Sequence, residues 1–295
     1  MAPFYFSGND MIHDPRCYEC LLSRVDLEIE LANYDKKKKS EIIAHADELI
    51  RFLHKTPWTH PMVASALHRA MYQWLNNSDP FHALKQASDE VSIEVLKTVS
   101  GRLTGFRELV IASVIGNMFD YGVKDHEISN DFLSYFDQEF EKGLTVDDTD
   151  QILPLCNEIV YFTDNCGEIV FDQALISWLV AHGSSVTLVV RDKPILNDAT
   201  MEDAIRLGLD KQVTRLLTTG AGVEHGVRFD LMSDDLLHAL DRCSLIISKG
   251  MANYESLREE QGLPPVAYLL AAKCDPIAGE LGVSRGAKLA LLRNA

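Results

Sequence analysis

Two patterns of hydrophobic and polar residues divide the chain. From residue 16 to 143, apolar residues recur at spacings of three and four, which is typical of amphipathic helices. From about residue 150 the pattern changes to short β-rich runs separated by segments long enough for helices. These runs are NEIVYFTD, SVTLVVRD, QVTRLLTTG, SLIISKG and PVAYLLAAKC. The alternation predicts a mainly parallel, Rossmann-like α/β sheet with helices on both faces.

The change of pattern predicts two domains. We expect an N-terminal all-α domain over residues 1–145 and an α/β domain, which holds the metal and the catalytic residues, over residues 146–295. The boundary lies in the partly acidic, loop-forming stretch between residues 121 and 151, and the pattern fixes it to within about ten residues.

Composition and charge narrow the class of partner. A chain of 295 residues with 46% hydrophobic residues can bury a sizeable core. The formal charge of −16 opposes binding to nucleic acid and to anionic membrane surfaces. We therefore expect a partner that is small, cationic or bridged by a metal.

The cysteines and the N-terminal residues indicate the compartment. No apolar run of about eighteen residues occurs, and the N-terminus lacks the basic and then apolar layout of a secretion signal. We therefore expect a cytoplasmic protein, in which the six cysteines are mostly thiols or ligands. Cys17 and Cys20 form one C-x-x-C, which is half of a zinc site at best, so structural thiols are favoured over zinc. The sequence gives no sign of the oligomeric state.

The first loop of the α/β part carries two adjacent oxygen donors. Asp164 and Asn165 follow the first apolar run directly, and Gly167 permits close approach of the backbone to a ligand. The carboxyl ends of parallel strands share one edge of a sheet, where open α/β folds bind their ligands. Asp164 could equally cap the next helix, and Glu168 and Asp172 favour that helix dipole, so metal binding and capping both remain open.

The second loop adds a third oxygen donor, Asp198, which also has the position of a helix N-cap. If the two loops lie side by side, Asp164, Asn165 and Asp198 form a partial shell suited to Mg²⁺ or Mn²⁺. Capping alone would give no role to Asn165.

The later loops offer groups that suit a phosphate. Lys249 ends the fourth run, Asn253 and Glu255 follow it at a helix entrance, and Lys273 ends the fifth run. The alternative for Lys249 is an exposed lysine before a glycine turn.

In the helical part, Asn117 and Asp120 interrupt an apolar helix on one face. They either bond a neighbouring helix end or close over the site from the helical domain.

Three common enzyme motifs are missing from the sequence. The glycines at 220, 222 and 226 do not have the dinucleotide-binding spacing, although their loop is expected near the site. The sequence also contains no phosphate-binding P-loop and no nucleophile elbow.

Six motifs in order resemble the metal-dependent damage-control phosphatases, long catalogued as a domain of unknown function. They are CYEC, VIGNMFDYG, TDNCGEIVFD, KPILNDAT, SKGMANYESL and AAKCDPIAGELGVSRGA, and they span nearly the whole chain. The chain looks most like the prokaryotic branch with an N-terminal C-x-x-C. The resemblance implies an α/β domain beside a helical one, and hydrolysis of sugar phosphates or other phosphorylated metabolites, including damaged ones.

The resemblance also implies a site. It places a divalent metal, Mn²⁺, Co²⁺, Ni²⁺ or Mg²⁺, on Asp164, Asn165 and Asp198, and assigns the substrate phosphate to Lys249. The remaining pocket candidates are Asn117, Asp120, Asn253, Glu255 and Lys273. We take Asp164 and Lys249 as the catalytic residues, with attack by water preferred over attack by Asp164 itself.

Two other functions stay open at this point. The protein could hold a metal and a phosphorylated metabolite without turnover. It could also be a carboxyl methyltransferase, as some eukaryotic relatives have been described, although no glycine-rich methyl-donor loop follows the first strand.

Overall fold

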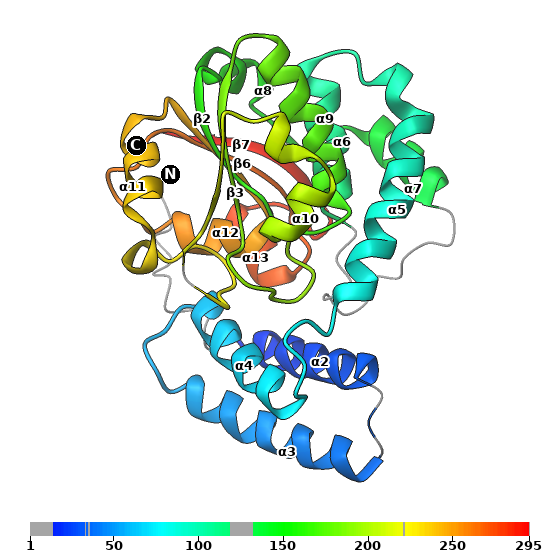
Figure 1. Cartoon of the computed structure of the whole chain (residues 1–295), viewed down its shortest axis with the longest axis vertical. Coiled ribbons are helices and arrows are strands. Elements are labelled where there is room, and N and C mark those ends of the chain that lie inside the picture. The colour runs from blue at the N-terminus through cyan, green and yellow to red at the C-terminus, as the bar shows by residue number, and fades with distance from the viewer. Residues whose placement is uncertain (1–13, 33, 35, 119–131, 221, 295) are drawn as a thin grey trace.

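The computed structural model describes residues 14–32, 34, 36–118, 132–220 and 222–294. The helices of these residues fall into an N-terminal group and a group that alternates with strands (Figure 1). The N-terminal group is α2 (Pro15–Leu31), α3 (Lys36–Leu53), α4 (His60–Trp74), α5 (His82–Val99), α6 (Phe106–Gly116) and α7 (Phe132–Lys142). The second group is α8 (Thr149–Ile152), α9 (Glu168–Ala181), α10 (Met201–Arg206), α11 (Asp234–Arg242), α12 (Gly250–Leu257) and α13 (Asp275–Leu281).

A seven-stranded sheet forms the centre of the C-terminal part, with strand order β1-β7-β6-β5-β2-β3-β4. All neighbouring strands are parallel except β6 and β7, which are antiparallel. The strands are β1 (Val146–Asp147), β2 (Glu158–Phe162), β3 (Ser185–Val190), β4 (Arg215–Thr218), β5 (Leu245–Lys249), β6 (Val266–Ala271) and β7 (Lys288–Arg293). The predicted fold class is confirmed, and β2 to β6 match the five predicted runs. The short β1 and the final β7 were not predicted.

Alternate residues of each strand pack against different helices. Ile159 and Tyr161 of β2 belong to a core shared with α6, α9 and α10, whereas Val160 and Phe162 belong to a core shared with α11, α12 and α13. Both faces of the sheet are therefore covered, which explains why the strands read as nearly continuous apolar runs.

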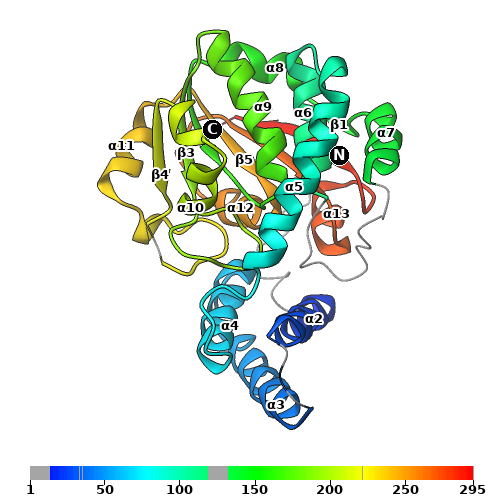
Figure 2. The same cartoon turned by 45° about the vertical axis from the view of Figure 1, so that its right-hand side comes forward.

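The N-terminal helices contribute to two different layers. Helices α2, α3 and α4 have a hydrophobic cluster of their own and lie beyond the strand ends as a separate layer (Figure 2). Helix α6 instead packs on α9 and shares the core of the sheet. The division of the chain near residue 145 stays a prediction. Among the described residues, no helix has both the length and the apolar character needed to cross a membrane.

Candidate metal and substrate site

The loop after β2 lies where the order in which the chain adds strands to the sheet reverses. From β2 the chain continues to β3 and β4 on one side, and later returns to β5 on the other side of β2. The loops after β2 and β5 therefore diverge and leave room for a ligand. Asp164 and Asn165 follow the end of β2 at this point.

The loops after β2 and β3 are held together by backbone contacts. Asn165 and Asp198 form an isolated antiparallel bridge. The backbone N–H of Ala199 donates to the carbonyl of Asp164 at 2.8 Å, and that of Cys166 donates to the carbonyl of Asn197 at 2.8 Å. The predicted juxtaposition of Asp164, Asn165 and Asp198 is therefore present.

The capping alternatives for the two aspartates are wrong, because other residues cap the helices that follow. The N-cap of α9 is Gly167, which has a φ of +81°. The N-cap of α10 is Thr200, which forms a capping box with Asp203. Asp164 and Asp198 therefore have no capping role that would account for their burial.

Asp198 is buried beside an arginine. Arg191 donates from Nε to Asp198 Oδ2 at 2.6 Å, and His225 Nδ1 lies 3.6 Å from the same oxygen. Burial alone would raise the pKa of Asp198, but the Arg191 guanidinium and His225 outweigh it and lower that pKa. The carboxyl is therefore ionised at neutral pH. Its other oxygen, Oδ1, is buried and has no hydrogen-bond partner among the described residues.

Asp164 has the opposite electrostatic environment. Asn117 and Asn165 donate to its Oδ2 at 3.0 and 3.1 Å, and Arg191 lies 3.9 Å from Oδ1. Burial, Asp198 and Glu168 raise the pKa of Asp164 well above its usual range. A cation at this position would relieve the repulsion between the carboxylates.

The chemistry of these donors fits a hard divalent cation. Two carboxylates and a carboxamide supply oxygen atoms. The buried Asp198 Oδ1 accepts no hydrogen bond from the described residues, so it can bind a cation instead. The residues present therefore fit a divalent cation such as Mg²⁺ or Mn²⁺.

Lys249 lies behind this site among acidic groups. Its Nζ is 2.7 Å from Glu168 Oε1 and 3.0 Å from Asp172 Oδ1, and it also donates to the carbonyl and hydroxyl of Ser113. Glu168 in turn accepts from Asn117 Nδ2 at 2.9 Å and from the Asn165 backbone N–H at 3.2 Å. The fully buried Lys249 is thus connected to the metal residues through Glu168.

Asn253 has a similar supporting position. Its Nδ2 donates to the carbonyls of Thr163 and Lys249 at 3.0 and 2.8 Å, and its Oδ1 accepts from Arg191 Nη2 at 3.0 Å. Asn253 therefore holds the ends of β2 and β5 together and fixes Arg191.

A cavity of about 790 Å³, open solvent included, brings five of the predicted residues together. Its walls include Asp164, Asn165, Asp198, Glu255 and Lys273. The predicted residues Asn117, Lys249 and Asn253 are buried and are not among its described lining residues. Asp120 lies outside the described residues.

The same cavity contains polar groups that the sequence did not indicate. His225 comes from the glycine loop expected near the site, and Arg24 and His60 come from the helical layer. The sequence indicates these three residues only weakly, because each is a single polar residue in a helix or loop. Only the fold brings them to the ends of the strands. Cys17, Cys20 and Cys274 also line the cavity, although the two ends of the chain supply them.

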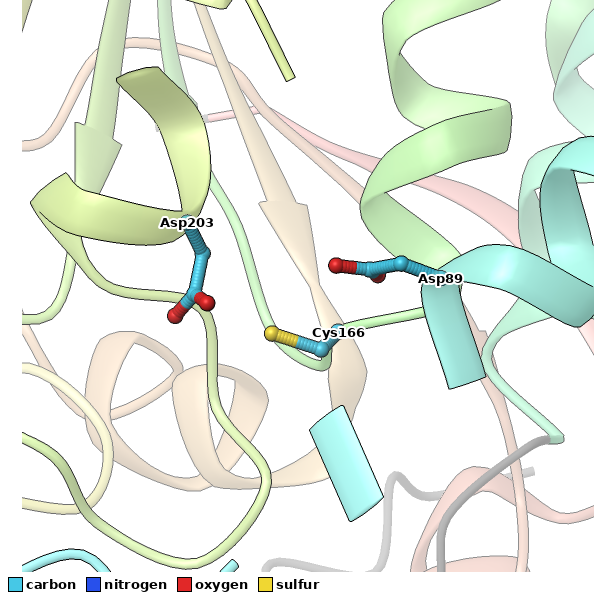
Figure 3. A group of neighbouring side chains, drawn as sticks. All are labelled: Asp89, Cys166 and Asp203. Carbon is cyan, nitrogen blue, oxygen red and sulfur yellow. The ribbon is translucent and has the colours of Figure 1, made fainter. Parts of the chain in front are cut away.

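A second group with metal-ligand chemistry includes Cys166, which directly follows Asn165 in the β2 loop. Ligand atoms of Asp89, Cys166 and Asp203 lie within 4.8 Å of one another, with Cys166 directed between the two aspartates (Figure 3). Lys85 Nζ is 3.1 Å from Asp203, and Arg206 lies 2.6 Å from Asp89 and 3.0 Å from Asp203. This cluster could bind a metal, but the two cations already balance the carboxylates, so the oxygen set around Asp164 fits better.

The chain matches a known protein family over most of its length. Residues 13–289 match the model of the damage-control phosphatase ARMT1-like domain. The chain belongs to this family.

Relatives in the family cover almost the whole chain. A damage-control phosphatase from Archaeoglobus fulgidus is 38% identical over 281 residues, which is 92% of this chain and 96% of the relative. One from Pyrococcus horikoshii is 29% identical over 94% of this chain and 96% of its own length. The crystal structure of a DUF89 family protein from Pyrococcus horikoshii matches with a TM-score of 0.86 at 28% identity, covering 96% of this chain and 99% of that one. The predicted family is confirmed.

Proposed function

We propose that the protein is a divalent-metal-dependent phosphatase that hydrolyses sugar phosphates or related, damaged phosphorylated metabolites in the cytoplasm. The observation that supports this most is the convergence of Asp164, Asn165 and Asp198 on one cavity shared with Lys273. The relatives from Archaeoglobus fulgidus and Pyrococcus horikoshii are both named damage-control phosphatases, which agrees with the proposal.

Asp164, Asn165 and Asp198 would hold the metal, with Mn²⁺, Co²⁺, Ni²⁺ or Mg²⁺ as the expected ions. When bound, the ion supplies positive charge that polarises a phosphoryl oxygen and orients a water molecule for attack. Arg191 keeps Asp198 ionised and in place for this role.

Lys273 and Lys249 would act at different distances from the phosphate. Lys273 lines the cavity, and its charge acts directly on Asp164, so it is placed to attract phosphoryl oxygens. Lys249 contacts Glu168 and Asp172 instead. We therefore revise its predicted role, from phosphate ligand to a residue that positions Asp164 and Asn165 through Glu168.

Two further features favour phosphate hydrolysis at this position. The fourteen-residue helix α9 begins just after the metal residues, and its N-terminal dipole favours a phosphate there. Burial raises the pKa of Glu255 to about 7, so this cavity carboxyl can hold or release a proton near neutral pH. Attack by water remains our preferred route.

The test is phosphate release from a panel of sugar phosphates, nucleotides and p-nitrophenyl phosphate. Chelator-treated protein is resupplied with one metal at a time and compared with Asp164→Ala, Asp198→Ala and the exposed control Asp210→Ala. We expect metal-dependent turnover that falls at least about a hundredfold in the first two variants only, because the ion supplies several kcal/mol of stabilisation. Metal and phosphate ester binding without any release would instead favour a binding protein.

A further inference from the structure

Three cysteines from opposite ends of the described chain line one cavity. Cys17 and Cys20 belong to α2, and Cys274 is the residue before α13. All three are free thiols, of which Cys17 is buried and the other two are half-buried. The sequence leaves the C-x-x-C pair without a further ligand, and the fold brings Cys274 to the same cavity as that pair.

An ion pair beside the cysteines joins the two helices. Arg16 Nη1 of α2 lies 3.6 Å from Asp275 Oδ2 of α13. Arg16 directly precedes Cys17, and Asp275 directly follows Cys274. Helix α2 lies next to α13 in both views (Figures 1 and 2). Cys20 follows Cys17 by about one helical turn, so the start of α2 places both thiols near Cys274.

The electrostatics of the thiols agree with this placement. Burial raises the pKa of Cys17, and the charges of Glu255 and Cys274 raise it further. Burial raises the pKa of Cys274 to about 11, against a hydrogen bond from the Ile277 backbone, and the charges of Glu255 and Cys20 add to the effect of burial. Thiolates at these positions would therefore repel one another unless a cation lies among them.

The cysteine side chains must rotate to share one ion. Their three sulfur atoms are not all within 4.8 Å of one another, unlike the ligand atoms of Asp89, Cys166 and Asp203. A single torsion, χ1, moves each sulfur between its staggered positions. Rotation of the half-buried thiols of Cys20 and Cys274 can thus bring the sulfur atoms together without movement of the helices.

We propose that Cys17, Cys20 and Cys274 bind one soft divalent ion, with Zn²⁺ as the expected metal, and so join the helical layer to the α/β part. Three thiols lose three protons to the buffer as three metal–sulfur bonds form. A tetrahedral ion keeps a fourth position for water or an oxygen atom of the cavity. The oxygen donors around Asp164 suit harder ions, so the two sites differ in the metals that they select. This second site does not depend on the proposed phosphatase activity.

The test is a titration of reduced protein with Cd²⁺, in excess Mg²⁺ that occupies oxygen sites. Cadmium–thiolate bonds absorb ultraviolet light, so the absorbance reports the ions that sulfur binds. Wild type is compared with Cys20→Ser, Cys274→Ser and Cys243→Ser, and displacement of Cd²⁺ by Zn²⁺ gives the affinity for zinc. Cys243 is the matched control, because it is also a half-buried free cysteine, and its Sγ donates to the Leu240 carbonyl at 3.3 Å.

We expect the absorbance of wild type to saturate at one Cd²⁺ per chain, with release of about three protons per ion. Cys20→Ser and Cys274→Ser should each bind at least about a hundredfold more weakly, because each loses one thiolate ligand. Cys243→Ser should bind as wild type does. Circular dichroism of the metal-free variants checks their fold, and the proton count of wild type tests the three-thiol site without any variant.

A reduced wild type without cadmium–thiolate absorbance would overturn the proposal. Unchanged affinity in Cys274→Ser would do the same, since the ion would then not join α2 to α13, as would an equal loss in Cys243→Ser. If the thiolate site is present but no panel substrate releases phosphate, this proposal stands and the phosphatase proposal fails.

Discussion

Gly250 is the residue that most directly sets the geometry of the metal site. It follows β5 with a φ of +75°, and a Cβ atom added there would overlap the carboxyl group of Asp164. The backbone at the start of α12 therefore approaches Asp164 as closely as the absence of a side chain allows. The sequence shows only a glycine after a lysine, which reads as an ordinary turn.

Replacing Gly250 by alanine should damage both metal binding and stability. Gly262 is the matched control, because its φ is +74° and no other described residue beyond its chain neighbours has an atom within 4 Å of the added Cβ. We expect Gly262→Ala to lose about 1 kcal/mol of unfolding free energy from backbone strain, and Gly250→Ala to lose about 1–3 kcal/mol more because of the overlap. Only Gly250→Ala should also lose about tenfold or more in Mn²⁺ affinity, measured by calorimetry. Equal metal affinities in the two variants would contradict the overlap.

At the scale of elements, a buried ion-pair network ties α5 to α10 around the β2 loop. Lys85 of α5 lies 3.1 Å from both Asp79 and Asp203. In a second ion pair between the two helices, Arg206 of α10 lies 2.6 Å from Asp89 of α5. Asp89 also accepts from the backbone N–H of Gly167, so the network holds the loop that carries Asp164 and Asn165.

Lys85→Met should lower the unfolding free energy by about 3 kcal/mol, because it removes the lysine that pairs with Asp79 and one of the two cations that pair with the buried Asp203. Lys97→Met on the same helix should change it by no more than about 0.5 kcal/mol, since that lysine is 66% exposed and its ion-pair partner among the described residues is the exposed Glu94. Denaturant unfolding followed by circular dichroism measures both. A small effect of Lys85→Met would mean that the network does not hold α5 in place.

At the scale of the whole molecule, the helical layer is joined to the metal loops by hydrogen bonds. The backbone N–H of Leu196 donates to the hydroxyl of Tyr72 at 2.8 Å, and that of His225 donates to Ser65 Oγ at 2.8 Å. Leu196 has a φ of +47° and lies two residues before Asp198. The layer therefore helps to hold a strained turn beside a metal residue.

Tyr72→Phe should weaken Mn²⁺ binding severalfold and lower the unfolding free energy by about 1–3 kcal/mol, because the Leu196 N–H is left unpaired. Tyr34→Phe removes a hydroxyl that donates to the Leu75 carbonyl at 2.6 Å inside the helical layer. It should alter stability alone. Metal titration of both variants, beside thermal unfolding, separates the two effects. Equal metal affinities would show that the turn holds its shape without Tyr72.

The sequence predicted those features that depend on local pattern. Five strands, the edge of the sheet with the functional residues, and the neighbours Asp164, Asn165 and Asp198 follow from apolar runs and from what comes directly after them. The pattern could not show that Lys249 faces Glu168 and Asp172, because all three read as polar residues at strand or helix ends. Arg24 and His225 were missed since their place in the cavity depends on long-range packing.

The edge strand β1 has a consequence for how the chain folds during its synthesis. Among the described strands, β1 pairs with β7 alone, and β7 contains almost the last described residues. During synthesis, β1 and the edge of β6 stay unpaired until β7 has emerged from the ribosome. β2 and β3 are close in the chain and can pair much earlier. The metal loops can thus form in a nascent chain whose sheet is still open at one side, and shortening the C-terminus would leave that edge available to other chains.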